Sequence, residues 1–360
     1  MIARVLSCGA LAAACLSLAV MSGCRQSSPA EKVAWDGSLS LPDVDSVANI
    51  GVAGAFGGIV NGNLLIAGGA NFPGGFPWTG AEKVWHTTLY AYNFASGEWS
   101  VLPDFLPEPL GYGVSLTLPE GVMLIGGNNA SGGSTAVRLL TEEDGVPVLR
   151  SDSLPQLPFP LSNSAGAMVG NRIYLAGGIR SDRGERSSHT FLTLDLDRMD
   201  EGWRELPAWP GPELGFSVAA GAGGKFYLFG GRDFAPDKDT VVSTAGYVYD
   251  PESGEWTLLD CEFPVMAATA VTIDDDIWFF GGVEKILPTD PNHPGFTRTL
   301  RRYTPSTGEL VEVCESPFPL AVTTTAVPVP DDNSVIITSG EVRPGVRTPL
   351  VLRCTISAAD

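Results

Sequence analysis

Leu64-Leu65-Ile66-Ala67-Gly68-Gly69 is an apolar run that ends in two glycines, and this pattern occurs six times in the 360-residue chain. The other five copies, the last of which has Ser in place of the first Gly, are residues 122–127, 173–178, 226–231, 277–282 and 335–340. Successive copies start 51 to 58 residues apart. A pattern that recurs at a nearly constant period indicates that the chain consists of six copies of one structural unit.

The first five copies each carry the strands of a four-stranded antiparallel sheet. A strand of small residues, such as Ser164-Ala165-Gly166-Ala167-Met168-Val169, precedes the Gly-Gly strand and suits the crowded centre of a propeller. After the glycines come a loop, a third strand such as residues 246–250, a turn and an outer strand that starts at Glu255. A period near 50 residues with Gly-Gly closing a strand is typical of the kelch repeat. The sequence therefore predicts an all-β fold, a six-bladed kelch-type β-propeller.

The two ends of the chain together supply the strands of the last blade. The sixth copy continues with only one further strand, Leu350 to Ile356, so its outer strand is missing. Near the other end, residues 33–42 have the pattern of residues 98–103, an outer strand with a Trp near its start. We therefore expect the N-terminal strand to complete the sixth blade, which removes free sheet edges. Residues 33–360 then form a single domain.

The first 23 residues resemble an export signal of the bacterial lipoprotein type. Residues 5–21 are apolar, and Met21-Ser22-Gly23 leads into Cys24. Small residues directly before a Cys at the end of such a stretch are typical of a lipobox. We expect Cys24 to be the lipidated first residue of the mature protein and residues 24–32 to be a tether; an ordinary cleaved signal peptide is the alternative. The expected location is the bacterial periplasm or outer membrane, with the lipid on Cys24 as the only membrane attachment.

The chain is strongly acidic, with 41 Asp and Glu against 22 Lys and Arg and a net charge of −19. No basic run interrupts this acidity, which argues against nucleic acid as a partner. An acidic protein repels anions at long range. A site for an anionic ligand therefore has to be built from a few local Arg or Lys residues.

Cysteine and histidine spacing gives no sign of a metal site. Cys261, Cys314 and Cys354 follow the export segment without a C-x-x-C pair, and the three histidines are far apart in the sequence. We therefore expect no bound metal. Cys261 and Cys314 each end an outer strand of neighbouring repeats, so they either form a disulfide or remain free thiols.

Charged and polar side chains gather in the loops that follow the Gly-Gly pairs. These loops leave the blades on the same face of a propeller, so they surround one mouth. An Arg- or Lys-lined mouth suits a carboxylate, because the guanidinium is a planar bidentate donor. The alternative is that these loops are simply solvated. The candidate substrate-binding residues are Asn71, Lys83, Arg180, Arg232 and Arg343.

Two segments go beyond the repeat pattern. They are Gly68-Gly69-Ala70-Asn71-Phe72-Pro73 with its continuation to His86, and Ser339-Gly340-Glu341-Val342-Arg343-Pro344-Gly345-Val346-Arg347-Thr348. Both resemble segments of the N-acetylneuraminate epimerase (sialic acid mutarotase) family of kelch propellers, as does Gly111-Tyr112-Gly113-Val114-Ser115-Leu116. In that family the Glu-x-x-Pro-Gly-x-Arg motif precedes the Gly-Gly-Ala segment, whereas here it follows. The chain is therefore similar to the cyclically permuted mutarotase branch, and a circular fold with adjacent ends tolerates such permutation.

The resemblance implies a sugar isomerase. In the epimerases the Glu of this motif is the catalytic acid/base and the Arg six residues later is also required, which corresponds to Glu341 and Arg347 here. The implied reaction interconverts the anomers of N-acetylneuraminate by proton transfers that open and close the ring, with no cofactor. Arg347, with Arg180 or Arg232, would hold the sugar carboxylate. Two alternatives stay open: a structural Glu341–Arg347 ion pair, and a non-catalytic kelch propeller that binds a glycan or a protein at the cell surface.

Overall fold

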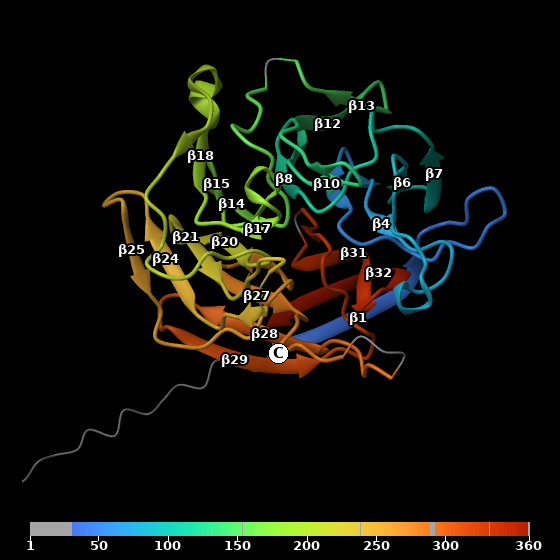
Figure 1. Cartoon of the computed structure of the whole chain (residues 1–360). Coiled ribbons are helices and arrows are strands. Elements are labelled where there is room, and N and C mark those ends of the chain that lie inside the picture. Colours follow the sequence, from blue (N-terminus) through green and yellow to red (C-terminus); the bar gives the residue numbers. More distant parts are fainter. Residues whose placement is uncertain (1–30, 153, 238, 289–291, 331, 359–360) are drawn as a thin grey trace, which may run out of the picture.

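The computed structural model describes residues 31–358 except 153, 238, 289–291 and 331. Its architecture is almost entirely β: six four-stranded antiparallel sheets stand around a central axis as the blades of a propeller (Figure 1). The helices in this part of the chain are three short 3-10 turns, η1 (Pro77–Thr79), η2 (Ser181–Arg183) and η3 (Leu196–Glu201). The predicted six-bladed β-propeller is confirmed.

The first five blades each use four strands taken in chain order, from the axis outward. Blade 1 consists of β2 (Phe56–Val60), β3 (Asn63–Ala67), β6 (Leu89–Asn93) and β7 (Glu98–Leu102). Blade 2 consists of β8 (Val114–Leu118), β9 (Gly121–Ile125), β12 (Val137–Glu143) and β13 (Val146–Arg150). Blade 3 consists of β14 (Ala165–Val169), β15 (Arg172–Ala176), β18 (Phe191–Asp195) and β19 (Arg204–Glu205). Blade 4 consists of β20 (Val218–Ala222), β21 (Lys225–Phe229), β24 (Gly246–Asp250) and β25 (Glu255–Leu258). Blade 5 consists of β26 (Thr269–Ile273), β27 (Asp276–Phe280), β28 (Thr299–Thr304) and β29 (Glu309–Glu315).

In blades 1 to 4 the loop after the Gly-Gly strand forms a small two-stranded sheet. The pairs are β4 (Ala70–Asn71) with β5 (Val84–Trp85), β10 (Asn128–Asn129) with β11 (Gly132–Gly133), β16 (Ile179–Arg180) with β17 (Arg186–Ser187), and β22 (Arg232–Asp233) with β23 (Val241–Val242). Both glycines of each pair have a positive φ, a conformation that residues with a Cβ atom disfavour. The Gly-Gly pair therefore ends the blade strand and redirects the chain into this ribbon.

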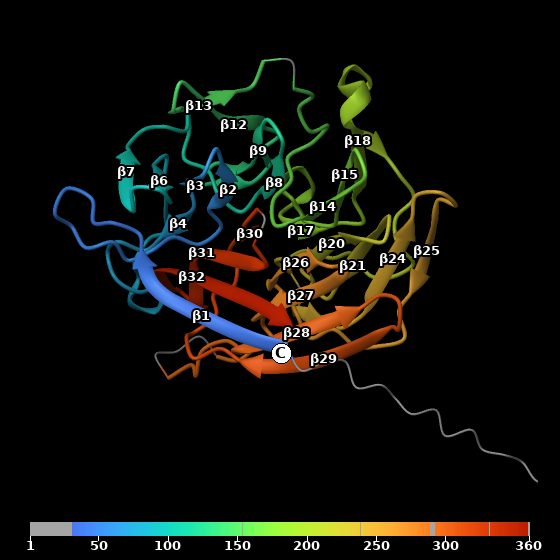
Figure 2. The same cartoon turned by 180° about the vertical axis from the view of Figure 1, so that it is seen from behind.

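Both ends of the described chain meet in blade 6, whose strands from the axis outward are β30 (Ala326–Pro328), β31 (Ser334–Arg343), β32 (Val346–Ala358) and β1 (Glu31–Ser40). Strand β1 runs antiparallel to β32 and places Trp35 opposite Cys354. Figure 2 shows β1 lying along the outer edge of this blade. The prediction that the N-terminal strand completes the last blade is confirmed.

Hydrophobic side chains between neighbouring blades form the core. In β21, Phe226 packs with blade 3 residues such as Phe191, whereas Phe229 packs with Phe279 of blade 5. Successive side chains of a strand point to opposite faces of its sheet, so one strand supplies two interblade cores. Phe226 and Phe229 are fully buried, and burial of such a side chain contributes about 1.5–3 kcal/mol.

The three cysteines of the propeller are free. Of the two alternatives for Cys261 and Cys314, the structure therefore has the free thiols. Burial raises the pKa of the Cys354 thiol to about 12. Cys24 lies outside the described residues. Within the described part, no helix combines the length and the hydrophobicity needed to cross a bilayer.

Six backbone positions, one per blade, form a closed ring of hydrogen bonds around the axis. The N–H of each donates to the C=O of the corresponding residue in the preceding blade, with N···O distances of 2.6 to 3.0 Å. All six have a positive φ, between 46° and 68°. This hydrogen-bonded ring consists of Gly54, Tyr112, Asn163, Phe216, Ala267 and Thr323.

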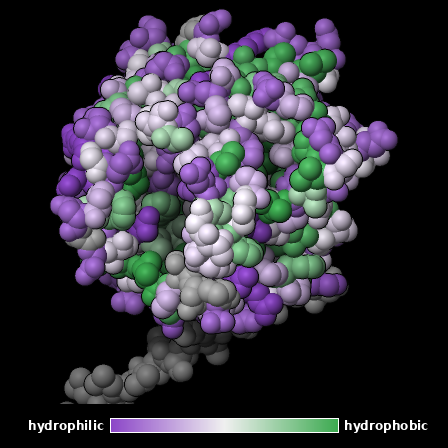
Figure 3. All heavy atoms as spheres, turned by 45° about the vertical axis from the view of Figure 1, so that its right-hand side comes forward, coloured by the Kyte–Doolittle hydropathy of each residue, from purple (hydrophilic) through white to green (hydrophobic). Residues whose placement is uncertain are grey.

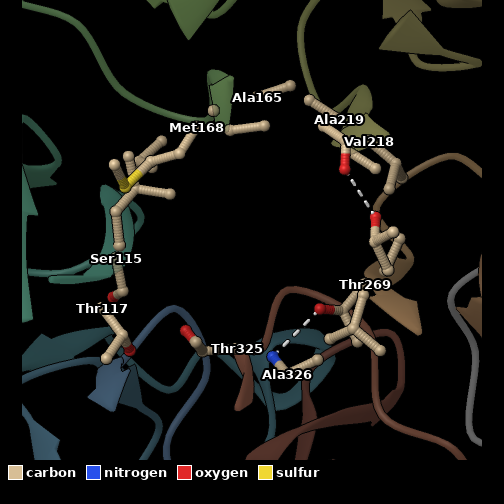
Figure 4. A pocket seen from close by; sticks show the side chains of 18 of the residues that line it. Ser115, Thr117, Ala165, Met168, Val218, Ala219, Thr269, Thr325 and Ala326 are labelled. Atoms are coloured by element: carbon tan, nitrogen blue, oxygen red, sulfur yellow. Dashed lines mark hydrogen bonds between the residues drawn. The ribbon is translucent and has the colours of Figure 1, made fainter. Parts of the chain in front are cut away.

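An axial cavity of about 400 Å³ lies inside the inner strands. Figure 4 shows its wall, in which short side chains such as Ser115, Ala219 and Thr325 surround an open centre. A smaller cavity of about 100 Å³, lined by the hydrogen-bonded ring, shares lining residues with the axial cavity and with a third cavity at the mouth of the propeller. The ring thus forms the floor of the mouth.

Candidate active site

The mouth cavity has a volume of about 340 Å³. Its wall consists mainly of loops that follow the Gly-Gly strands and of four residues of the hydrogen-bonded ring. The charged residues in the wall are Lys83, Glu185, Arg232, Glu341 and Arg347. The other lining residues are Phe72, Pro77, Tyr112, Asn128, Asn163, Ile179, Phe216, Phe234, Thr323 and Gly345.

Glu341 and Arg347 face each other across the β-hairpin of β31 and β32. The pairing register sets one opposite the other, with the turn at Pro344-Gly345. Oε2 of Glu341 lies 3.3 Å from Nη1 of Arg347, and the Gly345 N–H donates a 2.7 Å hydrogen bond to Oε1. The sequence expectation that this turn returns the Arg to the carboxylate agrees with the structure. Contacts at both oxygens hold the carboxylate in one orientation.

The Arg347 guanidinium connects blade 6 to residues of blades 1 and 2, which are Ala70, Phe72 and Tyr112. Its side chain is only 3% exposed. Nε donates to the Ala70 carbonyl at 3.3 Å, Nη2 donates to the Tyr112 hydroxyl at 3.2 Å, and the guanidinium lies 4.9 Å from the Phe72 ring centre. Nη1 is buried and has no hydrogen-bond partner among the described residues, although it contacts Glu341. Its contact with Glu341 is therefore an ion pair without a hydrogen bond.

Arg232 and Lys83 are cations without a carboxylate partner among the described residues. The Arg232 guanidinium lies between the rings of Phe216 and Phe234, at 4.1 and 4.7 Å from their centres. Burial lowers the pKa of Arg232, and its Nε has no hydrogen-bond partner in the described chain. The Lys83 ammonium lies 4.6 Å from the centre of the Tyr112 ring. Both cations line the mouth cavity, where an anion would compensate them.

The other three candidate binding residues lie outside the lining of the mouth cavity. Asn71 is buried and structural: its amide donates to the Gly51 carbonyl, and its Oδ1 is 2.8 Å from Nε2 of His86. Arg180 forms a two-point ion pair with Asp182 and lies over a Phe ring. Arg343 lies at the end of β31, next to the hairpin turn. The sequence could identify the loops but not which of their side chains turn into the cavity.

Comparison with known proteins identifies the family. The family model of N-acetylneuraminate epimerase matches residues 20–147 and 154–289. The chain belongs to the N-acetylneuraminate epimerase family. The match ends before β31, so it does not include Glu341 or Arg347. Their assignment depends on the motif and on the geometry of the hairpin.

Relatives of this epimerase-family chain include three curated proteins named N-acetylneuraminate epimerase. The Brucella melitensis protein is 27% identical over 235 residues, which cover 56% of this chain and 58% of the relative. The Haemophilus influenzae protein is 25% identical over 226 residues, or 55% of this chain and 58% of the relative. The Yersinia pestis protein is 43% identical over 98 residues, or 25% and 24% of the two chains. The chain spans little more than half the length of the relatives that it matches most extensively.

Four residues of the site were not predicted from the sequence: Tyr112, Asn163, Phe216 and Thr323. They belong to the hydrogen-bonded ring and line the mouth cavity. A signal was present, because each ring residue stands two or three positions before the inner strand of its blade. These positions do not form a recognisable sequence motif, because six different residue types occupy them: Gly, Tyr, Asn, Phe, Ala and Thr.

The mouth cavity of this epimerase-family protein combines a fixed carboxylate with cations and a phenol. A carboxylate can accept and return a proton, and Arg and Lys can hold an anionic group. Within the described residues, no group of three or more His, Cys, Asp or Glu side chains is arranged to hold a metal ion. The arrangement therefore suits proton transfer on an anionic ligand.

Proposed function

We propose that this protein is an isomerase that interconverts the anomers of N-acetylneuraminate by acid/base ring opening. The observation that carries the proposal is the Glu341–Arg347 pair, held at the wall of the mouth cavity. The same wall contains Arg232 and Lys83, for which the described part of the chain offers no carboxylate partner. Membership of the N-acetylneuraminate epimerase family supports the choice of reaction. The names of the curated relatives support the choice of sugar.

The cations of the mouth cavity favour a sugar that carries a carboxylate. The protein as a whole is acidic, with a net charge of −19, and hydrophilic residues cover much of the face in Figure 3. The cations Arg232 and Lys83 in the mouth cavity therefore contrast with the overall charge. A buried guanidinium such as that of Arg232 is costly unless an anion compensates it. A substrate carboxylate beside Arg232 in the mouth cavity would supply that charge. A neutral sugar would leave the charge of the Arg232 guanidinium uncompensated.

Glu341 is the general base of the proposed reaction. It removes the proton of the anomeric hydroxyl, a carbonyl forms, and the bond between the anomeric carbon and the ring oxygen breaks. The ring oxygen keeps the electron pair of the broken bond and takes up a proton. Rotation beside the carbonyl lets the ring close on the opposite face, where both proton transfers reverse and Glu341 returns its proton to the anomeric oxygen. The Gly345 N–H and Arg347 keep the carboxylate at one place throughout. The reaction moves protons without net oxidation or reduction, so it needs no cofactor.

The proposal is tested by measuring anomer exchange by NMR with the wild-type protein. Magnetisation exchange between the α and β signals of N-acetylneuraminate is compared with the spontaneous rate, and glucose serves as the neutral-sugar control. We expect exchange of the acidic sugar to accelerate in proportion to protein concentration and that of glucose to stay at the spontaneous rate. Binding of N-acetylneuraminate without acceleration would instead support the non-catalytic binding module.

A further inference from the structure

Tyr112 brings a phenol into the mouth cavity beside the Glu341–Arg347 pair. It is the blade 2 member of the hydrogen-bonded ring, and its φ is 61°, which bulky residues disfavour. The phenol ring lies against Gly54, where a Cβ atom would come within 2.6 Å of the Tyr112 ring. Because the phenol occupies this space, the neighbouring position of the hydrogen-bonded ring, Gly54, has to be a glycine.

The backbone at this position does not require a tyrosine. Ala267 and Thr323 adopt the same left-handed conformation at equivalent ring positions with much smaller side chains. A bulky residue in a disfavoured conformation at a cavity wall points to a role for its side chain. The contacts of the phenol hydroxyl indicate what that role is.

The Tyr112 hydroxyl has a proton that it can donate to a ligand in the mouth cavity. Its oxygen accepts the 3.2 Å hydrogen bond from Nη2 of Arg347, and the Lys83 ammonium lies 4.6 Å from the ring centre. The hydroxyl proton itself has no acceptor among the described residues. Tyr112 is 8% exposed and lines the mouth cavity, so a ligand there can accept this proton.

We propose that Tyr112 is the second acid/base residue of the ring opening, an inference that depends on the function proposed above. Opening a pyranose requires a proton to leave the anomeric hydroxyl and another to reach the ring oxygen. Glu341 takes the first proton, and the electrons of that O–H bond form the carbonyl. The bond from the anomeric carbon to the ring oxygen breaks, and its electron pair takes the proton of Tyr112.

The open intermediate then faces a protonated Glu341 and a Tyr112 phenolate. Arg347 and Lys83, which already contact the phenol, stabilise the phenolate. On closure the phenolate takes the proton of the sugar hydroxyl, whose oxygen attacks the carbonyl, and the carbonyl oxygen takes the proton from Glu341. Both residues return to their starting states, so the cycle balances.

The variant Tyr112→Phe tests the inference because it keeps the aromatic ring and removes only the hydroxyl. We expect kcat for exchange of N-acetylneuraminate, measured by NMR, to fall by roughly 10²–10⁴. KM and the melting temperature should stay near the wild-type values. Tyr90→Phe is the matched control: Tyr90 is a buried tyrosine whose hydroxyl accepts a 3.2 Å hydrogen bond from Asn49, outside the lining of the mouth cavity. This control should retain the wild-type kcat.

The outcomes separate this inference from the function on which it depends. Wild-type exchange in Tyr112→Phe together with an inactive Glu341→Gln would refute the role of Tyr112 and leave the proposed function standing. A raised KM with unchanged kcat would show that the hydroxyl only positions Arg347, and it would refute the inference as well. A wild-type protein without exchange activity would refute both.

Discussion

At the scale of a single residue, Arg232 is a buried cation in the wall of the mouth cavity, where an anion would compensate its charge. Its guanidinium is sandwiched between Phe216 and Phe234, and burial lowers its pKa. Among the described residues nothing neutralises it. A buried charge without a partner destabilises the folded protein. The ligand-free protein therefore carries a local instability that binding of an anion removes.

We predict that Arg232→Met weakens substrate binding and stabilises the free protein. Loss of charge-assisted hydrogen bonds, about 1.5–3 kcal/mol, should raise the Kd for N-acetylneuraminate by at least tenfold. Removal of the unpaired charge should raise the free energy of unfolding by about 1 kcal/mol. Titration calorimetry and urea unfolding measure the two effects.

Arg180→Met is the matched control for this prediction. Arg180 is also a buried Arg that contacts a Phe ring, but it is paired with Asp182 and lies outside the cavity lining. This variant should lose stability and keep its affinity. An unchanged Kd in Arg232→Met would show that the substrate anion binds elsewhere.

At the scale of elements, the hairpin of β31 and β32 sets the position of Glu341, the proposed general base. Gly345 has a φ of 78°, and its N–H holds Oε1 of Glu341. A Cβ atom at this position would lie 2.3 Å from Cγ of Pro77, in the 3-10 turn η1 of blade 1. The turn thus has to be glycine for two reasons, its backbone conformation and the close packing of η1.

We predict that Gly345→Ala slows anomer exchange by at least tenfold, because the turn must move and carry its N–H away from Glu341. The backbone strain should also cost about 1–3 kcal/mol of stability. Gly308→Ala is the control, since Gly308 has a similar φ of 71° but no atom of the described residues lies within 4 Å of its Cβ position. It should lose about 1 kcal/mol and keep full exchange. Equal exchange rates in the two variants would contradict the positioning role of Gly345.

Elements were easier to predict from the sequence than the site. The Gly-Gly period identified the blades, and the truncated sixth copy identified β1 as its outer strand, because strand patterns are local. The closeness of Glu341 and Arg347 also followed from a local turn. The roles of Arg180 and Tyr112 were not predicted. Arg180 is held by Asp182, two residues further along in η2, and this pairing was not predicted from the sequence. The position of Tyr112 depends on hydrogen bonds between blades, which local patterns do not encode.

At the scale of the whole molecule, β1 closes the propeller. Its Trp35 packs edge-on against Phe280 of blade 5, with the ring centres 6.3 Å apart, and contributes to the core between blades 5 and 6. The strand also covers the outer edge of β32. Closure therefore links the two ends of the chain and protects a sheet edge.

We predict that Trp35→Ala lowers stability by about 2–4 kcal/mol, since Trp35 is partly buried between blades. Limited proteolysis should then cut within residues 31–40, where the wild-type protein is protected. Trp99→Ala is the control, because Trp99 occupies the outer strand β7 of blade 1 and packs on Tyr92. It should lose stability without releasing β1. Protection of β1 in Trp35→Ala would contradict the role of Trp35 in closure.

In the proposed reaction Glu341 acts as a catalytic base, whereas a purely structural ion pair with Arg347 would leave it without a chemical role. Glu341→Gln keeps the shape of the side chain and removes its proton-transfer function. Glu284→Gln is the matched control: Glu284 also follows a Gly-Gly pair and lies 2.5 Å from the buried Arg301, but it is outside the mouth cavity. Rates of N-acetylneuraminate anomer exchange and melting temperatures are measured for both variants.

Exchange spectroscopy on these two variants distinguishes the catalytic from the structural role of Glu341. We predict that Glu341→Gln slows catalysed exchange by roughly 10²–10⁴ and still binds the sugar, while Glu284→Gln exchanges at the wild-type rate. Wild-type exchange in a folded Glu341→Gln protein would contradict the account and leave Glu341 and Arg347 as a structural ion pair.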